Sequence, residues 1–156
     1  MNQKVVDALN QGRQRELLAV SQYMVQHYEL EDQMYGKLAS RFKKIGIQEM
    51  RHAEDFAERV LFLGGVPADK PDVPAKKGQA IREMLQTGIA LEKEAIKMYN
   101  DAAKLCSDEG DHVSKQLFER LAQDEEAHLD EFQNTLDFVD KLGGNYLATL
   151  VSAEGD

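Results

Sequence analysis

Cysteine, proline and tryptophan are scarce in this chain of 156 residues. It has no tryptophan, a single cysteine at Cys106, and three prolines that all lie between residues 67 and 74. One thiol excludes an internal disulfide, and it also excludes zinc sites or rubredoxin-type iron sites built from four cysteines. A lone, unpaired cysteine indicates a reducing compartment, so a cytoplasmic location is expected.

Long hydrophobic runs are also missing. No stretch approaches the roughly 18 consecutive apolar residues that a membrane-spanning helix needs, and the opening residues MNQKVVDALNQGRQ lack the apolar core of a signal peptide. The chain has fewer basic than acidic residues, which gives a formal net charge of −9. This balance argues against nucleic acids and anionic membranes as partners, and it favours the attraction of cations.

Apolar residues recur every three or four positions, which is the pattern of amphipathic helices, and no segment shows sustained strand alternation. The pattern predicts four long helices, followed by a short fifth helix that Asn145 caps. The predicted ranges are 4–34, 37–63, 79–107, 112–142 and 145–153. The sequence therefore predicts an all-α fold, organised as one domain over residues 1–156.

All three prolines fall in GGVPADKPDVPAKKG, residues 64–78, which is the one long segment that cannot be helical. A segment of this length reaches about 50 Å when extended, whereas a helix spanning residues 37–63 is about 40 Å long. The segment can therefore cross the full length of a bundle. Helices two and three are then parallel, and the short joints make the other neighbours antiparallel.

Two Glu-x-x-His motifs lie in the second and fourth predicted helices. Glu49 and His52 belong to QEMRHAED, and Glu125 and His128 belong to QDEEAHLDE, 76 residues further along. Positions i and i+3 share one face of a helix, so each pair can bind a metal from one side. A single motif of this kind is most often a solvated surface pair, so the repetition at a fixed offset carries the argument.

The same 76-residue offset relates two further pairs of residues. It carries Glu16 onto Glu92, both mid-helix in apolar surroundings, and Tyr23 onto Tyr99. The chain therefore reads as two similar helical hairpins related by an approximate two-fold axis. In such a bundle, four glutamates and two histidines converge at one level.

Four buried carboxylates need a counter-charge. Two like charges 4 Å apart repel by about 4 kcal/mol at an effective dielectric near 20, so some glutamates would otherwise stay protonated. Two divalent metals neutralise four carboxylates if both histidines are neutral. Oxygen-rich ligation with one imidazole per metal favours iron or manganese. The alternative is a structural bundle whose acidic core binds no redox metal, which the repeat argues against.

The segments RELLAVSQY, IQEMRHAEDFAERVLFLGGVP, IALEKEAIKMY and DEEAHLDEFQ resemble bacterioferritin, the haem-containing branch of the ferritin family. The resemblance covers essentially the whole chain. It implies a ferritin-like four-helix bundle with a short fifth helix, assembled from dimers into a hollow shell of twenty-four subunits. It also implies iron storage and detoxification: a ferroxidase (Fe²⁺:oxygen oxidoreductase) oxidises Fe²⁺ with O₂ or H₂O₂ and deposits ferric mineral.

The resemblance assigns roles to individual residues. Two iron ions per subunit would be held by six ligands, with Glu49 and Glu125 as bridges, and Tyr23 would lie close to the centre. Met50 would bind the iron of haem b, shared between two subunits; without the resemblance, Met50 reads as a dimer-packing residue. A ferredoxin-type protein is an expected reductant. The six implied ligands are Glu16, Glu49, His52, Glu92, Glu125 and His128.

The chain also departs from the family pattern. Lys44 and Gln48 stand where an interior iron site would need histidine and aspartate, so an interior site is not expected. Gln48 breaks the internal repeat, because its counterpart is Asp124. Asp124 can accept the free ring N–H of a ligand histidine, whereas Gln48 can do so only through its neutral amide oxygen. His27 is interpreted as a packing or surface residue.

A rubrerythrin-like or erythrin-like di-iron peroxidase, which stores no mineral, is the main alternative function. The tyrosine pair formed by Tyr23 and Tyr99 resembles that of erythrin-type proteins. Against this alternative, Ala95 stands where rubrerythrins have an additional glutamate, and the rubredoxin cysteines are absent from the sequence.

Overall fold

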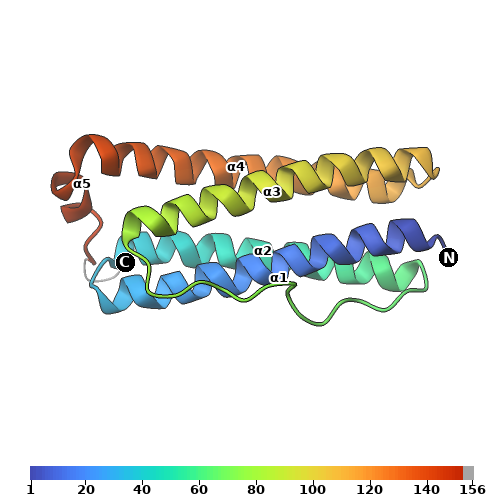
Figure 1. The fold of residues 1–156 in the computed structure, drawn as a ribbon, viewed down its shortest axis with the longest axis horizontal. Helices are drawn as coiled ribbons and strands as arrows, with labels where there is room; N and C mark the ends of the chain where they lie inside the picture. Colours follow the sequence, from blue (N-terminus) through green and yellow to red (C-terminus); the bar gives the residue numbers. More distant parts are fainter. Residues whose placement is uncertain (153–156) are drawn as a thin grey trace.

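The computed structural model describes residues 1–152, which form the all-helical bundle that the sequence predicts. Its helices are α1 (Gln3–Asp32), α2 (Gly36–Phe62), α3 (Ile81–Asp108), α4 (His112–Leu142) and the short α5 (Gly144–Ala148). Helices α1 and α2 form one hairpin, α3 and α4 form a second, and the two hairpins lie side by side (Figure 1). Within residues 1–152 there is no strand and no helix long and apolar enough to cross a membrane.

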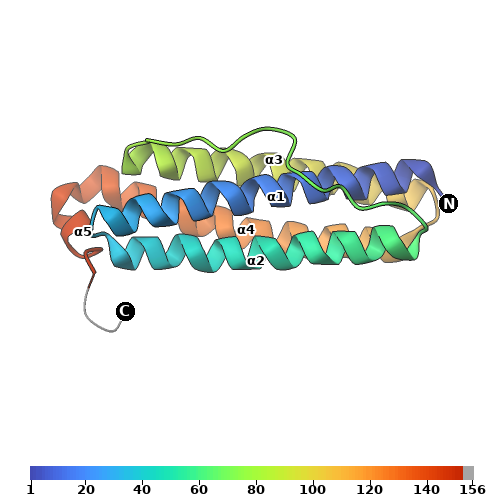
Figure 2. The ribbon, with the colours of Figure 1, turned by 90° about the horizontal axis from the view of Figure 1, so that it is seen from below.

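The segment between α2 and α3 runs lengthwise along the bundle, so α2 and α3 point in the same direction (Figures 1 and 2). Side-chain amides of α1 hold this segment. Asn10 accepts a hydrogen bond from Ala68 N at 2.8 Å and donates one to Val66 O at 3.0 Å. Gln22 makes the same two-way contact with Lys76, at 2.8 Å to N and 2.9 Å to O. These contacts satisfy backbone groups that an extended segment would otherwise leave unpaired.

The junction between α4 and α5 differs from the prediction. Asn145 was expected to cap α5, and this expectation is wrong, because the helix begins at Gly144 and its N-cap is Gly143. Gly143 has a φ of +53°, a left-handed value that glycine adopts without steric cost. The glycine pair therefore ends α4 and turns the chain directly into α5.

The hydrophobic core is divided into two clusters along the bundle axis. The cluster near the N-terminus contains the rings of Phe56, Tyr99 and Phe118, and the cluster near α5 contains those of Tyr23, Phe42 and Phe132. The helix positions between these clusters are occupied by buried polar residues. A polar layer enclosed by apolar rings on both sides excludes water from its charged groups, which strengthens their interactions.

Candidate metal centre

Each of the four long helices contributes to the polar layer at mid-length. The six side chains that the sequence analysis singled out all lie there, and none is more than 4% exposed. They are Glu16 on α1, Glu49 and His52 on α2, Glu92 on α3, and Glu125 and His128 on α4. The structure thus brings together residues that are up to 112 positions apart in the chain (16 to 128).

The six side chains form two overlapping sets of four. One set consists of Glu16, Glu49, His52 and Glu125, and the other of Glu49, Glu92, Glu125 and His128. Within each set, one ligand atom from every residue lies within 4.8 Å of the others. Because Glu49 and Glu125 belong to both sets, they can bridge two metal ions, while each ion keeps one glutamate and one histidine of its own.

Burial and neighbouring charges shift the pKa values of several groups in this centre. Burial raises the pKa of Glu16 and of Glu92 well above the ordinary value for glutamate, and neighbouring carboxylates raise it further. Burial alone would lower the pKa of His52 and His128, but hydrogen bonds to Glu125 and the other carboxylates outweigh it. They raise the pKa of His52 well above its usual range and that of His128 to about 12.

Two carboxylate oxygens have no donor to bind. Glu16 Oε2 and Glu92 Oε2 are buried and have no hydrogen-bond partner among the residues that the structure describes. Glu49 Oε1 lies 3.2 Å from Nδ1 of both His52 and His128. An unpaired, buried acceptor is costly unless a cation or a proton satisfies it. Oxygen and imidazole donors in this ratio suit iron or manganese. The donor set and its unpaired oxygens therefore fit two divalent ions.

Both tyrosines hydrogen-bond to the carboxylates, and each reaches into the other hairpin. The Tyr23 hydroxyl donates to Glu92 Oε1 at 2.6 Å, and the Tyr99 hydroxyl donates to Glu16 Oε1. Burial raises the pKa of both hydroxyls well above the ordinary value, so both keep their protons. The two bonds hold the unshared glutamate of each set in place.

The outer nitrogens of the imidazoles bind residues on opposite helices. His52 Nε2 donates to Asp124 Oδ2 at 2.9 Å, and His128 Nε2 donates to Gln48 Oε1 at 2.5 Å. Both partners are acceptors, so each bond leaves Nδ1 directed at the carboxylates, where a metal would bind. The prediction that Asp124 accepts a ring N–H is confirmed, and the histidine concerned is His52.

The 76-residue repeat extends further than the sequence analysis recognised. Phe42 and Phe118 are related by this offset, as are Phe56 and Phe132. With the two tyrosines they form two matching three-ring clusters. Within these clusters, ring centroids lie 5.3 to 6.2 Å apart. Applying the offset to every aromatic residue would have found these rings in the sequence.

Two glycines follow the same offset, and each makes room for one of the rings. A Cβ added at Gly12 would lie 2.7 Å from the ring of Phe56, and a Cβ added at Gly88 would lie 2.9 Å from the ring of Phe132. Any side chain at these positions would displace a ring that packs against Tyr99 or Tyr23. The glycines therefore support the placement of the tyrosines.

Met50 and His27 lie outside the metal centre and the rings that surround it. Met50 follows Glu49 on α2, yet its side chain is 43% exposed, next to the exposed Ile47 one turn away. An accessible thioether within an apolar surface fits either an interface or a haem ligand. His27 is buried with Nδ1 2.7 Å from Ala39 O, so it is a packing residue, in agreement with the sequence interpretation.

A cavity of about 320 Å³ opens above the two imidazoles on the face formed by α2 and α4. Lys44 and Gln48 line it together with Asp124. The oxygen of Gln48 is already used by His128. Neither the lysine nor the occupied amide supplies an anionic ligand, although the carboxylates of Asp124 and Glu131 also line this cavity. The absence of an interior iron site stays a prediction.

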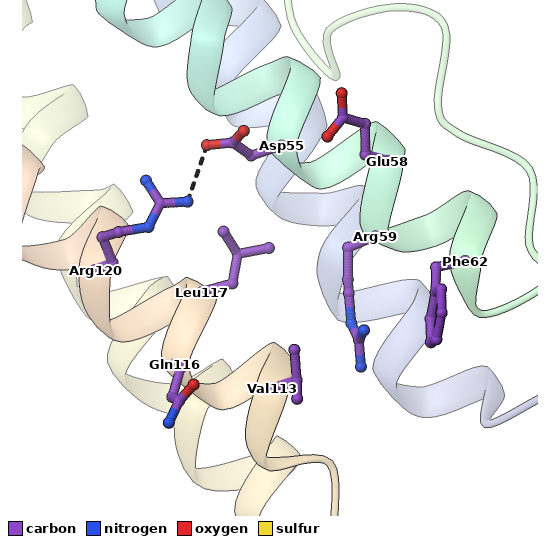
Figure 3. Close-up of a pocket in the computed structure, with 8 residues that line it drawn as sticks. All are labelled: Asp55, Glu58, Arg59, Phe62, Val113, Gln116, Leu117 and Arg120. Atoms are coloured by element: carbon purple, nitrogen blue, oxygen red, sulfur yellow. Dashed lines mark hydrogen bonds and ion pairs between the residues drawn. The ribbon is translucent and has the colours of Figure 1, made fainter.

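A larger cavity of about 650 Å³ lies further along α2 and α4, away from the centre (Figure 3). The cationic groups in it are paired. Arg59 binds Asp111 at 2.9 Å and lies 4.9 Å from the ring centroid of Phe62, and Arg120 binds Asp55 at 3.0 Å. Since the charge of each guanidinium is already paired with a carboxylate, the layer of buried glutamates and histidines is the better candidate for the functional site.

Metal binding at this centre should release protons and weaken in acid. Metals bind neutral imidazole and ionised carboxylate, whereas His52, His128, Glu16 and Glu92 all have raised pKa values. Anaerobic addition of Co²⁺ near neutral pH is therefore expected to release protons from the centre. The apparent affinity should fall as the pH is lowered. A pH-indicator titration in weak buffer measures both effects, and binding without proton release would contradict the ligand assignment.

The chain matches the family model described as a ferritin-like domain over residues 6–142. It is 42% identical over 147 residues to bacterioferritin of Desulfovibrio desulfuricans, covering 94% of this chain and 82% of that protein. It is 39% identical over 154 residues to bacterioferritin of Rhodobacter capsulatus, covering 98% and 95% of the two chains.

Solved structures give the same result for the fold. A structure of the D. desulfuricans bacterioferritin, described with its diiron site in different catalytic states, superposes with a TM-score of 0.94 at 39% identity, over 99% of this chain and 95% of that one. The R. capsulatus structure, described with a metal-free dinuclear site and a heme iron, superposes with a TM-score of 0.92 at 38% identity, over 100% and 98%. The chain belongs to the bacterioferritin family of ferritin-like proteins.

Proposed function

We propose that this protein is a ferroxidase that stores iron: it oxidises Fe²⁺ at the centre between the four helices and passes Fe³⁺ to a mineral. The observation that carries the proposal is the pair of overlapping ligand sets, which share Glu49 and Glu125. Family membership and the ferritin-like fold support the same reaction. Residues 1–156 are proposed to act as one ferritin-like domain.

Two Fe²⁺ ions held side by side can each give up one electron, so O₂ is reduced to H₂O₂, or H₂O₂ to water, with two protons consumed and no radical released. The protein's residues prepare this reaction. Glu49 and Glu125 are proposed to hold both ions at a short separation, and the imidazoles and the unshared glutamates to complete the two sites. The apolar rings on either side exclude water from the centre.

Tyr23 and Tyr99 are proposed to position the unshared carboxylates rather than to act as bases. Each hydroxyl donates to one of these oxygens, and its pKa is raised by burial, which keeps the proton in place. A buried tyrosine beside the centre is also able to supply an electron when only one Fe²⁺ is oxidised.

Met50 is proposed to bind haem b between two subunits, and the accessible thioether next to exposed Ile47 supports this role. When bound, haem would supply electrons that reduce stored Fe³⁺. Because Met50 of a symmetry-related copy would hold the same haem, this assignment requires a dimer. We also propose that such dimers assemble into a shell of twenty-four subunits in the cytoplasm and that a ferredoxin-type protein supplies the electrons. Membership of the bacterioferritin family supports these proposals. Nucleic acid and membrane are not proposed as partners.

Anaerobic Fe²⁺ titration followed by oxygen tests the proposed function. A ferroxidase binds about two Fe²⁺ per subunit at the centre and, after oxygen is admitted, continues to take up iron into a core. An erythrin-like peroxidase, which the Tyr99 contact with Glu16 would also suit, turns over with H₂O₂ but accumulates no mineral. A structural bundle binds no Fe²⁺ at this site, and that result would exclude the proposal.

A further inference from the structure

The two halves of the metal centre match in almost every group that surrounds the ions. The offset of 76 residues pairs the glutamate ligands, the histidine ligands, the two tyrosines, the packed rings and the two supporting glycines. A site built from such matched halves should bind two ions with similar affinity. An unmatched pair in contact with the ligands would therefore make the two sites different.

That unmatched pair is formed by Asp124 and Gln48, the acceptors of the outer imidazole nitrogens. His52 donates to a carboxylate, whereas His128 donates to a neutral amide. A carboxylate makes the imidazole a stronger metal ligand and adds a negative charge beside the ion, whereas an amide only fixes the ring orientation. The outer partner of a metal-binding histidine typically changes metal affinity by about 10- to 100-fold.

A second unmatched pair lies near the centre on the opposite face. Arg15 and its counterpart Leu91 both line a small void of about 10 Å³ beside Glu16, Glu49 and Glu92. The positive charge of Arg15 would disfavour an ion in the Glu16 set. This charge is compensated, because Arg15 pairs with Glu94 at 2.8 Å and lies 3.7 Å from Asp72. We therefore expect the effect of Asp124 to dominate.

We infer that Asp124 and Gln48 are positioning residues that make the two metal sites unequal, so that the ion in the His52 set binds first and more tightly. The inference rests on the proposed function and adds an order of loading to it. The site of the His52 set, which includes Glu16, holds its ion firmly. The site of the His128 set, which includes Glu92, exchanges its ion more readily.

Reversal of the two partners tests this inference. The variant Gln48→Glu/Asp124→Asn exchanges the charge while keeping the side-chain lengths, so both hydrogen-bond contacts survive. His128→Ala and His52→Ala, each made in the wild type and in the exchanged variant, isolate one site at a time. The measurement is anaerobic Co²⁺ affinity from the absorption titration, with circular dichroism to verify the helical fold.

In the wild-type background, the His128→Ala protein, which keeps the site with Asp124, should bind Co²⁺ at least about tenfold more tightly than the His52→Ala protein. In the exchanged background the order should invert. Equal affinities in the wild-type background, or the same order in both backgrounds, would overturn the inference.

If the histidine variants do not fold, the wild-type protein and the single variant Asp124→Asn still decide the question. Wild type should bind Co²⁺ in two resolved steps, and Asp124→Asn alone should merge them by weakening the first. A single step in wild type, or two steps unchanged in Asp124→Asn, would overturn the inference while leaving the proposed function intact. Failure of wild type to bind Co²⁺ at the centre would overturn both.

Discussion

Replacement of Glu92 by alanine is expected to abolish rapid Fe²⁺ oxidation while leaving the helical fold intact. Glu92 is the unshared carboxylate of the His128 set, so the variant keeps only the two shared glutamates and one histidine in that set. Loss of this carboxylate should slow oxidation of the first two Fe²⁺ per subunit by more than about a hundredfold. Even the loss of a residue that only hydrogen-bonds to a metal ligand lowers metal affinity or activity by up to about a hundredfold, and a direct ligand should matter more. Stopped-flow absorbance after mixing with oxygen measures the rate.

Glu83→Ala is the matched control for this experiment. Glu83 lies in the first turn of the same helix α3, and its side chain is exposed to solvent. The variant loses the same chemical group from the same helix and should oxidise Fe²⁺ at nearly the wild-type rate. Wild-type oxidation in Glu92→Ala would remove this residue from the ligand set.

The second large effect is expected for Met50→Leu, which should lose haem completely. Leucine has nearly the same volume as methionine but no sulfur, so an interface that merely packs here would tolerate the change. Met50 and Glu49 are adjacent in the chain, yet one side chain is 43% exposed and the other 2% exposed, so haem binding and metal binding should be separable. The absorption spectrum of the protein purified with saturating haem reports the outcome.

Ile47→Leu is the control, because Ile47 lies one turn from Met50 on the same exposed surface of α2 and carries no possible iron ligand. It should retain the haem spectrum. Size-exclusion chromatography of both variants would establish that the assembly survives. Full haem binding by Met50→Leu would show that the axial ligand lies elsewhere.

The sequence predicts the fold and the candidate ligands for the same physical reason. Helical periodicity is local, and the Glu-x-x-His spacing places two ligands on one face of a helix without any knowledge of its neighbours. The fixed offset between Glu49 and Glu125 then brings the second half of the site into the argument. These predictions agree with the structure because long helices with apolar stripes have few ways to pack against one another.

Contacts between helices could not be predicted in the same way. The sequence placed Tyr23 near the centre, but which carboxylate it binds depends on how the hairpins cross, and it reaches Glu92 in the other hairpin. The hydrogen bonds that Asp124 and Gln48 accept from histidines on the opposite helix also depend on how far side chains reach between α2 and α4. The error at Asn145 has a different origin. Asparagine is a preferred capping residue, but the left-handed conformation of Gly143 makes the turn, so α5 begins one residue earlier, at Gly144.

Two metal ions are proposed to bind to six named side chains, and anomalous diffraction tests this proposal most directly. Crystals soaked anaerobically in Fe²⁺ would be measured on both sides of the iron absorption edge. Two anomalous peaks are predicted within each subunit, one bounded by Glu16 and His52, the other by Glu92 and His128, with Glu49 and Glu125 between them. A single peak, or peaks confined to the cavity lined by Lys44 and Gln48, would contradict it.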